Sequence, residues 1–400
     1  MAAKKYRAGK MLNKFLKLIN YVYMKHLFDY SIDNKQLQGI KPPYIVLANH
    51  TNFWDPFLLS MCIPEPIYFV TSDAYFRNPV LKQLLRLVGA IPKTKLVSDP
   101  LSIRAILGVA KNNGVIGIFP EGRRNWDGKT LPLLYPTAKL IKFLGIPVVS
   151  VLFKGACLSM PRWSSSTRKG SLEMTLSKVL DLQEIKLLST DEIFSRISDS
   201  LSYNEYDYQR EHMHLYEGRN KAGKLELFLF CCPNCKSTGY MASSGEILHC
   251  SNCGYGVTYN SYGFFETDNQ KLYFDNPRDW NVWQLEHLDT VIALQMAENC
   301  QLPLLEEHNI VMRIGQRTGS LKTRAVDGTL YMYPDRLEYS IDAKVIECFS
   351  IGDISGENIQ FSNQLEFISK NTLYRFSAKN GIMSAYKWVK AIDAVKRFYK

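Results

Sequence analysis

The sequence predicts an α/β domain followed by two smaller modules, one built around cysteines and one of short strands closed by a helix. Short apolar runs alternate with helical patterns through the first half of the chain, which is typical of α/β layers. Five of the nine cysteines lie between residues 231 and 253, and strand-like segments dominate from Val311 onward. At 400 residues the chain is also too long for one compact core, since domains rarely exceed about 250–300 residues.

Residues 1–30 are predicted to form an amphipathic helix at a membrane interface. Over residues 8–30, apolar side chains recur at helical spacings, with lysines near or opposite them. The apolar face comprises Leu12, Phe15, Leu16, Ile19, Tyr23 and Leu27. The first fifty residues hold nine Lys or Arg against two Asp, which is most of the net charge of +11. Such a helix suits the surface of an anionic bilayer, and the alternative is packing on its own domain.

Residues 31–215 are expected to form the α/β domain. Strands are predicted at 44–48, 65–71, 115–119 and 147–152, and helices at 56–62, 79–88, 101–112 and 135–144. The capping box Ser189-Thr-Asp-Glu192 predicts the start of a last helix. A polar, glycine-containing linker follows at 217–224.

Three further segments are predicted after the linker. They are a small cysteine module at 225–266, a helical linker at 267–307 with its helix over 277–307, and a β-rich domain at 308–400 closed by a helix over 383–399.

The turn after the first apolar run carries His50 and Asp55, with four residues between them. An aspartate that holds Nδ1 of a histidine fixes its tautomer, so that Nε2 can take a proton from a hydroxyl as a general base. The pair alone fits equally a loop histidine that bonds to a nearby carboxylate. A second motif is needed to separate the two interpretations.

That second motif reads Phe-Pro-Glu-Gly-Arg-Arg-Asn over residues 119–125, after another apolar run. Gly122 permits a tight turn, and Arg123 and Arg124 bring guanidinium groups to the carboxyl end of a strand, where α/β sheets bind ligands. Guanidinium groups pair bidentately with phosphate oxygens. The turn is therefore a candidate phosphate site, and the alternative is a surface pair of arginines.

Together these motifs resemble those of the glycerolipid acyltransferase family, whose best-known members are 1-acylglycerol-3-phosphate acyltransferases. The matching segments are, in order, Asn49–Asp55, Gly89–Lys95, Phe119–Asn125 and Ile146–Val149. They resemble the family's Asn-His-x4-Asp, Gly-x-Ile-x-x-x-Arg and Phe-Pro-Glu-Gly-Thr-Arg-Ser blocks and its proline-containing strand. The resemblance covers about residues 35–205.

The resemblance implies that His50, oriented by Asp55, deprotonates the hydroxyl of a lysophospholipid, which then attacks an acyl thioester. The implied acceptor-phosphate site consists of Lys95, Glu121, Gly122 and Arg124. The implied donor is acyl-carrier protein or acyl-CoA, and the implied reaction converts lysophosphatidic acid into phosphatidic acid.

Four positions depart from the family pattern. Lys95 replaces an arginine, which keeps the charge but loses the planar fork. Arg123 and Asn125 replace Thr and Ser, and Ser150 replaces a common second proline. Because His50 is intact, the departures concern the identity of the acceptor more than the reaction.

Two C-x2-C knuckles, separated by fourteen residues, predict a structural zinc site. Their members are Cys232, Cys235, Cys250 and Cys253. Clustered cysteines in a chain without a secretory signal favour metal over disulfides, and four thiolates on two tight turns suit tetrahedral zinc. The segment is similar to a zinc ribbon, and Cys231 or His249 could substitute as ligands in another register.

The last ninety residues are similar to pleckstrin-homology-like (PH-like) domains, in which a β-barrel is capped by a helix. The closing helix carries Trp388 between Lys387 and Val389. Such a domain is expected to add affinity for a lipid headgroup or to bind a protein.

The expected setting is the cytoplasmic face of a membrane, with peripheral association. No apolar run is long enough for a transmembrane helix, and Lys14 and Lys17 interrupt the only stretch that could be a secretory signal. The expected partners are a lysophospholipid, an acyl thioester, an anionic membrane surface and an acidic acyl-carrier protein. Nucleic acid is not expected, because the basic excess lies mostly in the amino-terminal helix.

One alternative from another functional class remains: a catalytically inactive, membrane-associated scaffold whose zinc ribbon and PH-like domain bind partners. The intact pair of His50 and Asp55 argues against it.

Overall fold

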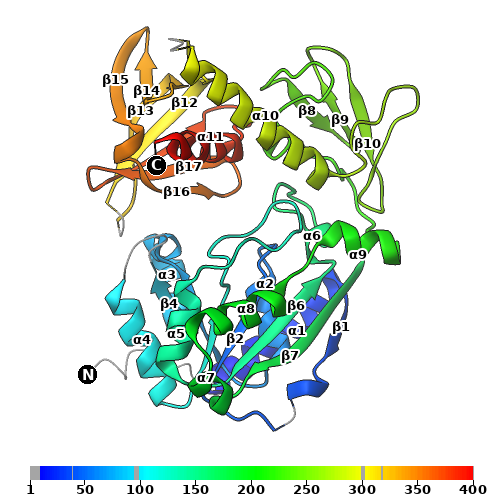
Figure 1. Cartoon of the computed structure of the whole chain (residues 1–400), viewed down its shortest axis with the longest axis vertical. Helices are drawn as coiled ribbons and strands as arrows, with labels where there is room; N and C mark the ends of the chain where they lie inside the picture. Colours follow the sequence, from blue (N-terminus) through cyan, green and yellow to red (C-terminus); the bar gives the residue numbers. More distant parts are fainter. Residues whose placement is uncertain (1–9, 38, 94–98, 299–301, 317–318, 400) are drawn as a thin grey trace. The chain divides into compact units, whose positions relative to one another are not determined.

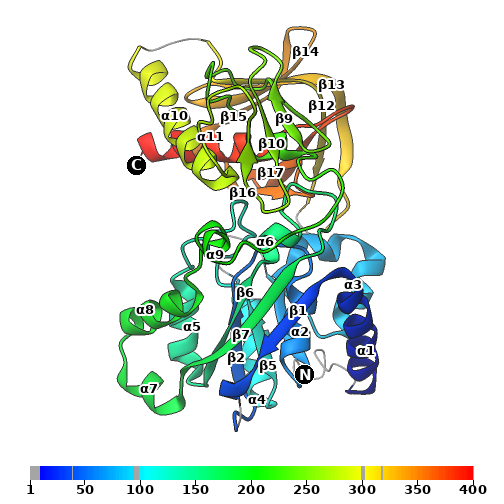
Figure 2. The same ribbon diagram turned by 90° about the vertical axis from the view of Figure 1, so that its right-hand side faces the viewer.

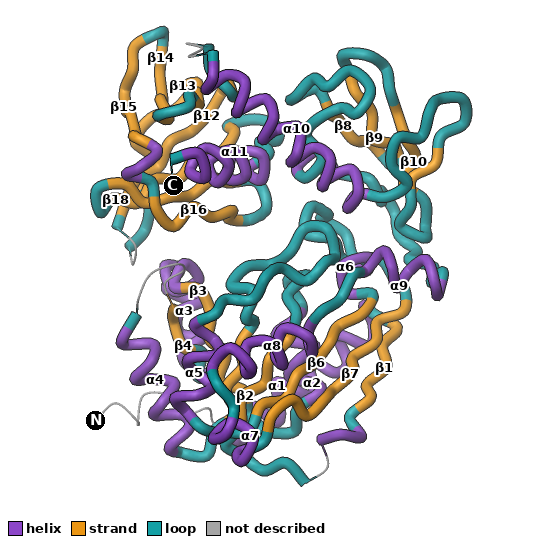
Figure 3. The backbone as a smooth tube through the Cα atoms, in the orientation of Figure 1, coloured by secondary structure: helices purple, strands orange, loops and turns teal. Residues whose placement is uncertain are grey.

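The computed structural model describes residues 10–37, 39–93, 99–298, 302–316 and 319–399, and divides them into two compact units (Figure 1). Unit 1 consists of the described residues up to Arg162, together with Ser166–Arg219 and Ser261–Gly263. Unit 2 consists of Trp163–Ser165, Asn220–Asn260 and the described residues from Phe264 onward. Helices and strands alternate in unit 1, whereas strands dominate unit 2 (Figure 3).

A seven-stranded mixed sheet forms the centre of unit 1, in the order β1-β7-β6-β2-β5-β3-β4. Its strands are β1 (Asp29–Asp33), β2 (Tyr44–Ala48), β3 (Ile67–Ser72), β4 (Ile91–Lys93), β5 (Val115–Ile118), β6 (Val148–Lys154) and β7 (Ser171–Leu180). Neighbours are parallel except β6 and β7. The carboxyl ends of β2, β5, β3 and β4 therefore lie at the same edge.

Helices cover both faces of this sheet. The helices described in unit 1 are α1 (Lys10–Leu27), α2 (Asp55–Cys62), α3 (Pro79–Leu87), α4 (Pro100–Lys111), α5 (Pro136–Leu144), α6 (Ala156–Ser159), α7 (Leu182–Leu187), α8 (Thr190–Leu201) and α9 (Glu205–His212). Successive residues of β2 point to opposite faces. Tyr44, Val46 and Ala48 pack in one core with α1 and α2, whereas Ile45 and Leu47 pack in another with α4, α5 and α8. Figure 2 shows α1 and the pair α5 and α8 on opposite sides of the sheet.

The predicted strands and helices of this unit all occur, with ends shifted by up to two residues. The capping box is confirmed, because the side chain of Ser189 accepts from the amide of Glu192 and the Glu192 carboxylate accepts from the amide of Ser189. Strands β1, β4 and β7 and helices α6, α7 and α9 were not predicted. The helix predicted over 8–30 is too long, since α1 ends at Leu27 and β1 pairs with β7.

Helix α1 packs on its own domain along one side and exposes apolar side chains on the other. Met24 is fully buried, and the Lys17 ammonium donates to the carbonyls of residues 63–65, just beyond α2, at 2.5–2.9 Å. Lys17 thus belongs to the packed side, and desolvation lowers its pKa. The exposed large apolar side chains of α1 are Phe15, Leu18, Ile19, Tyr21, Val22 and Tyr23. Among the described residues, no helix has both the length and the apolar character needed to cross a bilayer.

Unit 2 contains two antiparallel sheets. The smaller has the order β11-β10-β9-β8, with β8 (Met241–Ser244), β9 (Ile247–Cys250), β10 (Gly256–Tyr259) and β11 (Phe265–Glu266). The larger has the order β15-β14-β13-β12-β18-β17-β16. Its strands are β12 (Leu305–Gly315), β13 (Lys322–Met332), β14 (Arg336–Ile341), β15 (Lys344–Ser350), β16 (Ser355–Gln360), β17 (Gln364–Ser369) and β18 (Thr372–Ala378).

Two long helices accompany these sheets, α10 (Pro277–Ala297) and α11 (Ala385–Phe398). Short 3-10 turns lie at 225–227 and 351–353 in unit 2, and at 35–37 and 73–77 in unit 1. The predicted β-rich carboxyl-terminal region with a closing helix is observed, and Trp388 of α11 is fully buried. The helix predicted over 277–307 is too long, because α10 ends at Ala297 and β12 begins at Leu305. The bonds that residues 305–307 make with β13 place them in the sheet.

Candidate functional site

The site lies where β2 and β5 end side by side. His50 follows β2 by two residues and Glu121 follows β5 by three, so the parallel pairing of these strands brings the two turns together. The Asn49 side chain fixes the first turn against β6, because its amide group donates to the Phe153 carbonyl at 3.0 Å and its oxygen accepts from the Phe153 amide at 2.8 Å.

The carboxylate of Asp55 holds the imidazole of His50. Oδ2 lies 2.7 Å from Nδ1 and also accepts from the backbone amides of Thr51 and Asn52, at 2.6 and 3.0 Å. Asp55 is fully buried at the amino-terminal end of α2, where the helix dipole favours a negative charge. A carboxylate only accepts, so Nδ1 carries the hydrogen and Nε2 is the basic nitrogen of the neutral ring.

The ring of His50 is positioned by stacking as well as by hydrogen bonding. It stacks on Phe119 with the centroids 4.2 Å apart, and its side chain is 20% exposed. With one face on Phe119 and Nδ1 on Asp55, the ring has little rotational freedom. The structure therefore brings the predicted pair together and holds the ring in one orientation.

The second motif is joined to His50 through the backbone. Oε1 of Glu121 accepts from the His50 amide at 2.6 Å and Oε2 accepts from the Leu131 amide at 2.8 Å, while the Asn125 amide donates to the His50 carbonyl at 2.8 Å. Glu121 is almost fully buried, and desolvation raises its pKa to about 8. Its observed contacts join the two turns.

The loop that follows β5 turns at Gly122, whose φ is +69°. A side chain there would be strained, and a Cβ would lie 2.7 Å from the Leu134 side chain. Arg123 is exposed and Arg124 is half-buried. Lys95 lies outside the described residues, two positions beyond Lys93, where β4 ends at the same edge of the sheet.

Sequence reasoning missed two buried charged residues behind this loop. Arg162 donates from Nη1 to the Arg124 carbonyl at 2.6 Å. Glu205 accepts from the amides of Gly155 and Cys157 at 2.8 and 3.2 Å, and desolvation raises its pKa to about 7. Neither residue belongs to a local motif, and both act over long sequence separations, so no sequence signal marks them.

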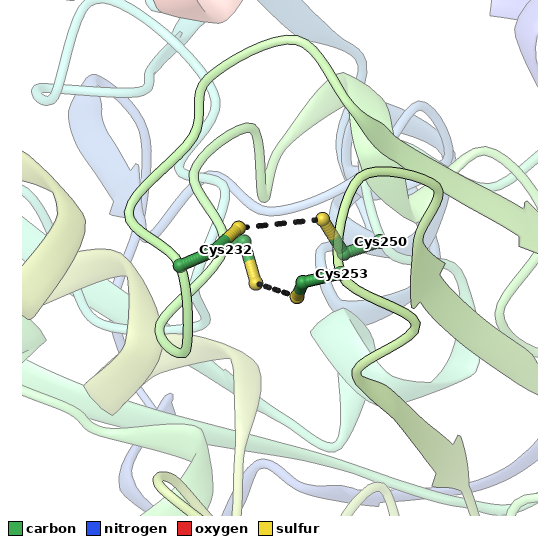
Figure 4. Close-up of side chains that lie close together, drawn as sticks. Cys232, Cys250 and Cys253 are labelled. Atoms are coloured by element: carbon green, nitrogen blue, oxygen red, sulfur yellow. Dashed lines mark hydrogen bonds between the residues drawn. The ribbon is translucent and has the colours of Figure 1, made fainter.

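The four predicted zinc ligands come together in unit 2. The Sγ atoms of Cys232, Cys235, Cys250 and Cys253 all lie within 4.8 Å of one another. The Cys232–Cys253 and Cys235–Cys250 pairs are each 3.7 Å apart, and Figure 4 shows the labelled thiols pointing toward one another. Four sulfurs about 2.3 Å from a tetrahedral zinc would lie about 3.8 Å apart, so the spacing fits. Cys231 lies outside the cluster, and its thiol bonds to the Lys236 carbonyl.

Residues 29–154, in unit 1, match the family model described as Acyltransferase. The chain is 24% identical over 173 residues to the chloroplastic 1-acyl-sn-glycerol-3-phosphate acyltransferase of Brassica napus, covering 42% of this chain and 49% of that protein. It is 20% identical over 170 residues to the 1-acyl-sn-glycerol-3-phosphate acyltransferase of Bacillus subtilis, covering 42% of this chain and 82% of that protein.

Two further similarities were found. The Saccharomyces cerevisiae 1-acyl-sn-glycerol-3-phosphate acyltransferase is 24% identical over 168 residues, covering 40% of this chain and 55% of that protein. A crystal structure of the 1-acyl-sn-glycerophosphate acyltransferase from Thermotoga maritima matches 50% of this chain and 79% of its own, with 17% identity and a TM-score of 0.43, too low to establish a common fold. The match spans about half the length of the Brassica and yeast relatives.

Proposed function

Starting from an acyltransferase-family domain with an imidazole held by a buried carboxylate, we propose that this protein transfers a fatty acyl group from a thioester to the hydroxyl of a lysophospholipid. The observation that carries the proposal is that the family match and the His50–Asp55 geometry fall on the same residues. The proposed acceptor is lysophosphatidic acid and the product phosphatidic acid, as the names of the relatives suggest.

In the proposed reaction, Nε2 of His50 takes the proton of the acceptor hydroxyl as its oxygen attacks the thioester carbonyl carbon. The new C–O bond forms, the C–S bond breaks, and the carrier sulfur leaves and takes up the proton from the imidazolium. Asp55 stabilises the imidazolium because its buried carboxylate carries the opposite charge. No side chain becomes acylated in this scheme.

The loop after β5 is proposed to bind the acceptor phosphate. Arg124 would supply a guanidinium fork, Gly122 the turn, and Glu121 the connection that fixes the loop beside His50. We assign Lys95 to the same site on its position in the motif. Holding the phosphate in this way places the hydroxyl near the base, which lowers the entropic part of the barrier.

The proposed location of the protein is the cytoplasmic face of a membrane. The proposed acyl donor is acyl-CoA or acyl-carrier protein. The exposed apolar side chains of α1 support peripheral association, as do the basic residues of this segment. Phe53 and Phe57, close to His50 in sequence, are also exposed. A surface of this kind would receive an amphiphilic acceptor directly from the bilayer.

Unit 2 is proposed to contain a structural zinc ribbon and a PH-like β-barrel. The four thiols would hold zinc in a closed site, and such a metal contributes to folding rather than to the reaction. Seven antiparallel strands followed by α11 match the element order of a PH-like domain. Its proposed partner is a lipid headgroup or a protein.

Acyl transfer from each thioester to a panel of lysophospholipids would test this function, with wild type measured beside His50→Ala. His287→Ala is a matched control, because His287 lies on α10 in unit 2. Product that depends on His50 but not on His287 would establish the reaction and identify the acceptor. Folded protein on vesicles that forms no product from any pair would instead favour the inactive scaffold.

A further inference from the structure

Arg162 is a buried cation that belongs to none of the family motifs. It lies just after α6, between β6 and β7, and is only 6% exposed. Its Nη1 donates to the carbonyl oxygen of Arg124 at 2.6 Å, and its guanidinium carbon lies 4.7 Å from the centroid of the buried Trp126 ring. Both partners are on the loop that follows β5.

The contacts of Arg162 define a conformation more than they stabilise the fold. Removing a guanidinium from water is costly, and a well-packed apolar side chain of similar volume often stabilises a protein as well or better. A charge-assisted bond to a carbonyl and a cation–π contact with an aromatic ring are, however, directional. These two contacts therefore specify where the main chain runs at Arg124.

The loop is held from two sides at successive residues. The amide of Asn125 donates to the His50 carbonyl, and the carbonyl of Arg124 accepts from Arg162. These two bonds set the distance between the base and the proposed phosphate-binding side chain.

We propose that Arg162 is a positioning residue for the acceptor phosphate, acting through Arg124 without touching the substrate; this rests on the proposed function. Arg162→Met should raise the KM for lysophosphatidic acid about ten- to hundredfold, the usual range for losing a hydrogen bond from a charged donor. The KM for the donor and kcat at saturating acceptor should change little. Arg162→Lys should recover part of the loss, because lysine keeps the charge but not the planar fork.

The test is steady-state acylation of lysophosphatidic acid by acyl-CoA, with wild type, Arg162→Met and Arg162→Lys measured side by side. Arg375→Met is the matched control, because Arg375 is a mostly buried arginine of unit 2 that is paired with Glu366. Circular dichroism and thermal melts would compare the folds. Calorimetric titration with a soluble short-chain lysophosphatidic acid would measure acceptor binding independently of turnover.

An unchanged acceptor KM in an active Arg162→Met enzyme would overturn the inference. Parallel rises in both KM values, or the same acceptor defect in Arg375→Met, would also overturn it, because they indicate a general structural role. Should Arg162→Met not fold, the Lys variant decides by the same criteria. An inactive wild type would refute the proposed function instead. The calorimetric titration would then still test the role of Arg162: weaker binding of lysophosphatidic acid by the Arg162 variants supports the inference, and equal binding refutes it.

Discussion

Replacing Asp55 by asparagine removes the negative charge beside His50 while keeping the shape of the site. The asparagine oxygen can still accept from Nδ1 and from the amides of Thr51 and Asn52, which are all now bonded to Oδ2. Asp55 is the first residue of α2, where losing its interaction with the helix dipole costs about 0.3–2 kcal/mol, so α2 should persist. The ring therefore keeps its tautomer, but the imidazolium that forms in the proposed reaction loses the opposite charge that stabilises it.

The size of the effect follows from the charge that is lost. A hydrogen bond to a charged group contributes about 1.5–3 kcal/mol, which corresponds to about ten- to 150-fold in rate. We therefore expect kcat to fall by about ten- to 150-fold, with little change in either KM, because Asp55 is buried.

Initial rates of acyl transfer at saturating substrates provide the assay, and Asp181→Asn provides the control. Asp181 caps α7 by accepting from the amides of Gln183 and Glu184 at 2.9 Å. It follows Leu180, which pairs with Val148 at the start of β6, so its replacement makes the same chemical change at the edge of the sheet opposite His50. The control should keep close to the wild-type rate. A folded Asp55→Asn enzyme that retains more than about a tenth of kcat would refute a role for the negative charge of Asp55.

Three further outcomes are expected. The pKa of Glu121, raised by burial from 4.5 to about 8, keeps the native carboxyl protonated where the unfolded chain ionises. The free energy of unfolding should therefore fall as pH rises between these values, by up to about 1.4 kcal/mol per pH unit. In urea melts at several pH values, the free energy of unfolding of Glu121→Gln should depend less on pH than that of the wild type. Elemental analysis should find about one zinc per chain, lost in Cys250→Ser but kept in Cys231→Ser, and zinc retained by the first variant would contradict the site. Ile19→Asp should weaken binding to anionic vesicles, whereas Leu187→Asp, at an 86% exposed apolar position in α7, should not; equal binding by both would count against α1 as the membrane contact.

The parts of the site that were predictable are those encoded within a few residues. His50 and Asp55 lie close in sequence, so their side chains meet within one turn, and the loop after β5 places its residues in the same way. The parallel pairing of β2 and β5 then brings both turns to one edge, as expected for an α/β sheet. Local spacing and a general rule of topology were sufficient here.

What could not be predicted depends on contacts between distant segments. Arg162 reaches Arg124 across 38 residues, and Glu205 reaches Gly155 across 50, so no local pattern relates them. Periodicity predicted helix α1 but could not tell which side is covered, and Lys17 proved to bond to the chain beyond α2. Strand β7 is different. Apolar and polar residues alternate in its sequence and match its buried and partly exposed positions, so it could have been predicted but was not.

The polar side chains near His50 bond mainly to backbone groups. Asn49 bonds to the backbone of β6, Glu121 to the amide of His50, and Arg162 to the carbonyl of Arg124. Each leaves the chemistry to another residue and fixes where that residue stands. A substitution at any of the three should therefore act by displacement, with effects graded by size and geometry. Loss of the His50 imidazole differs in kind, since no rearrangement of the loop can replace the nitrogen that we propose as the proton acceptor.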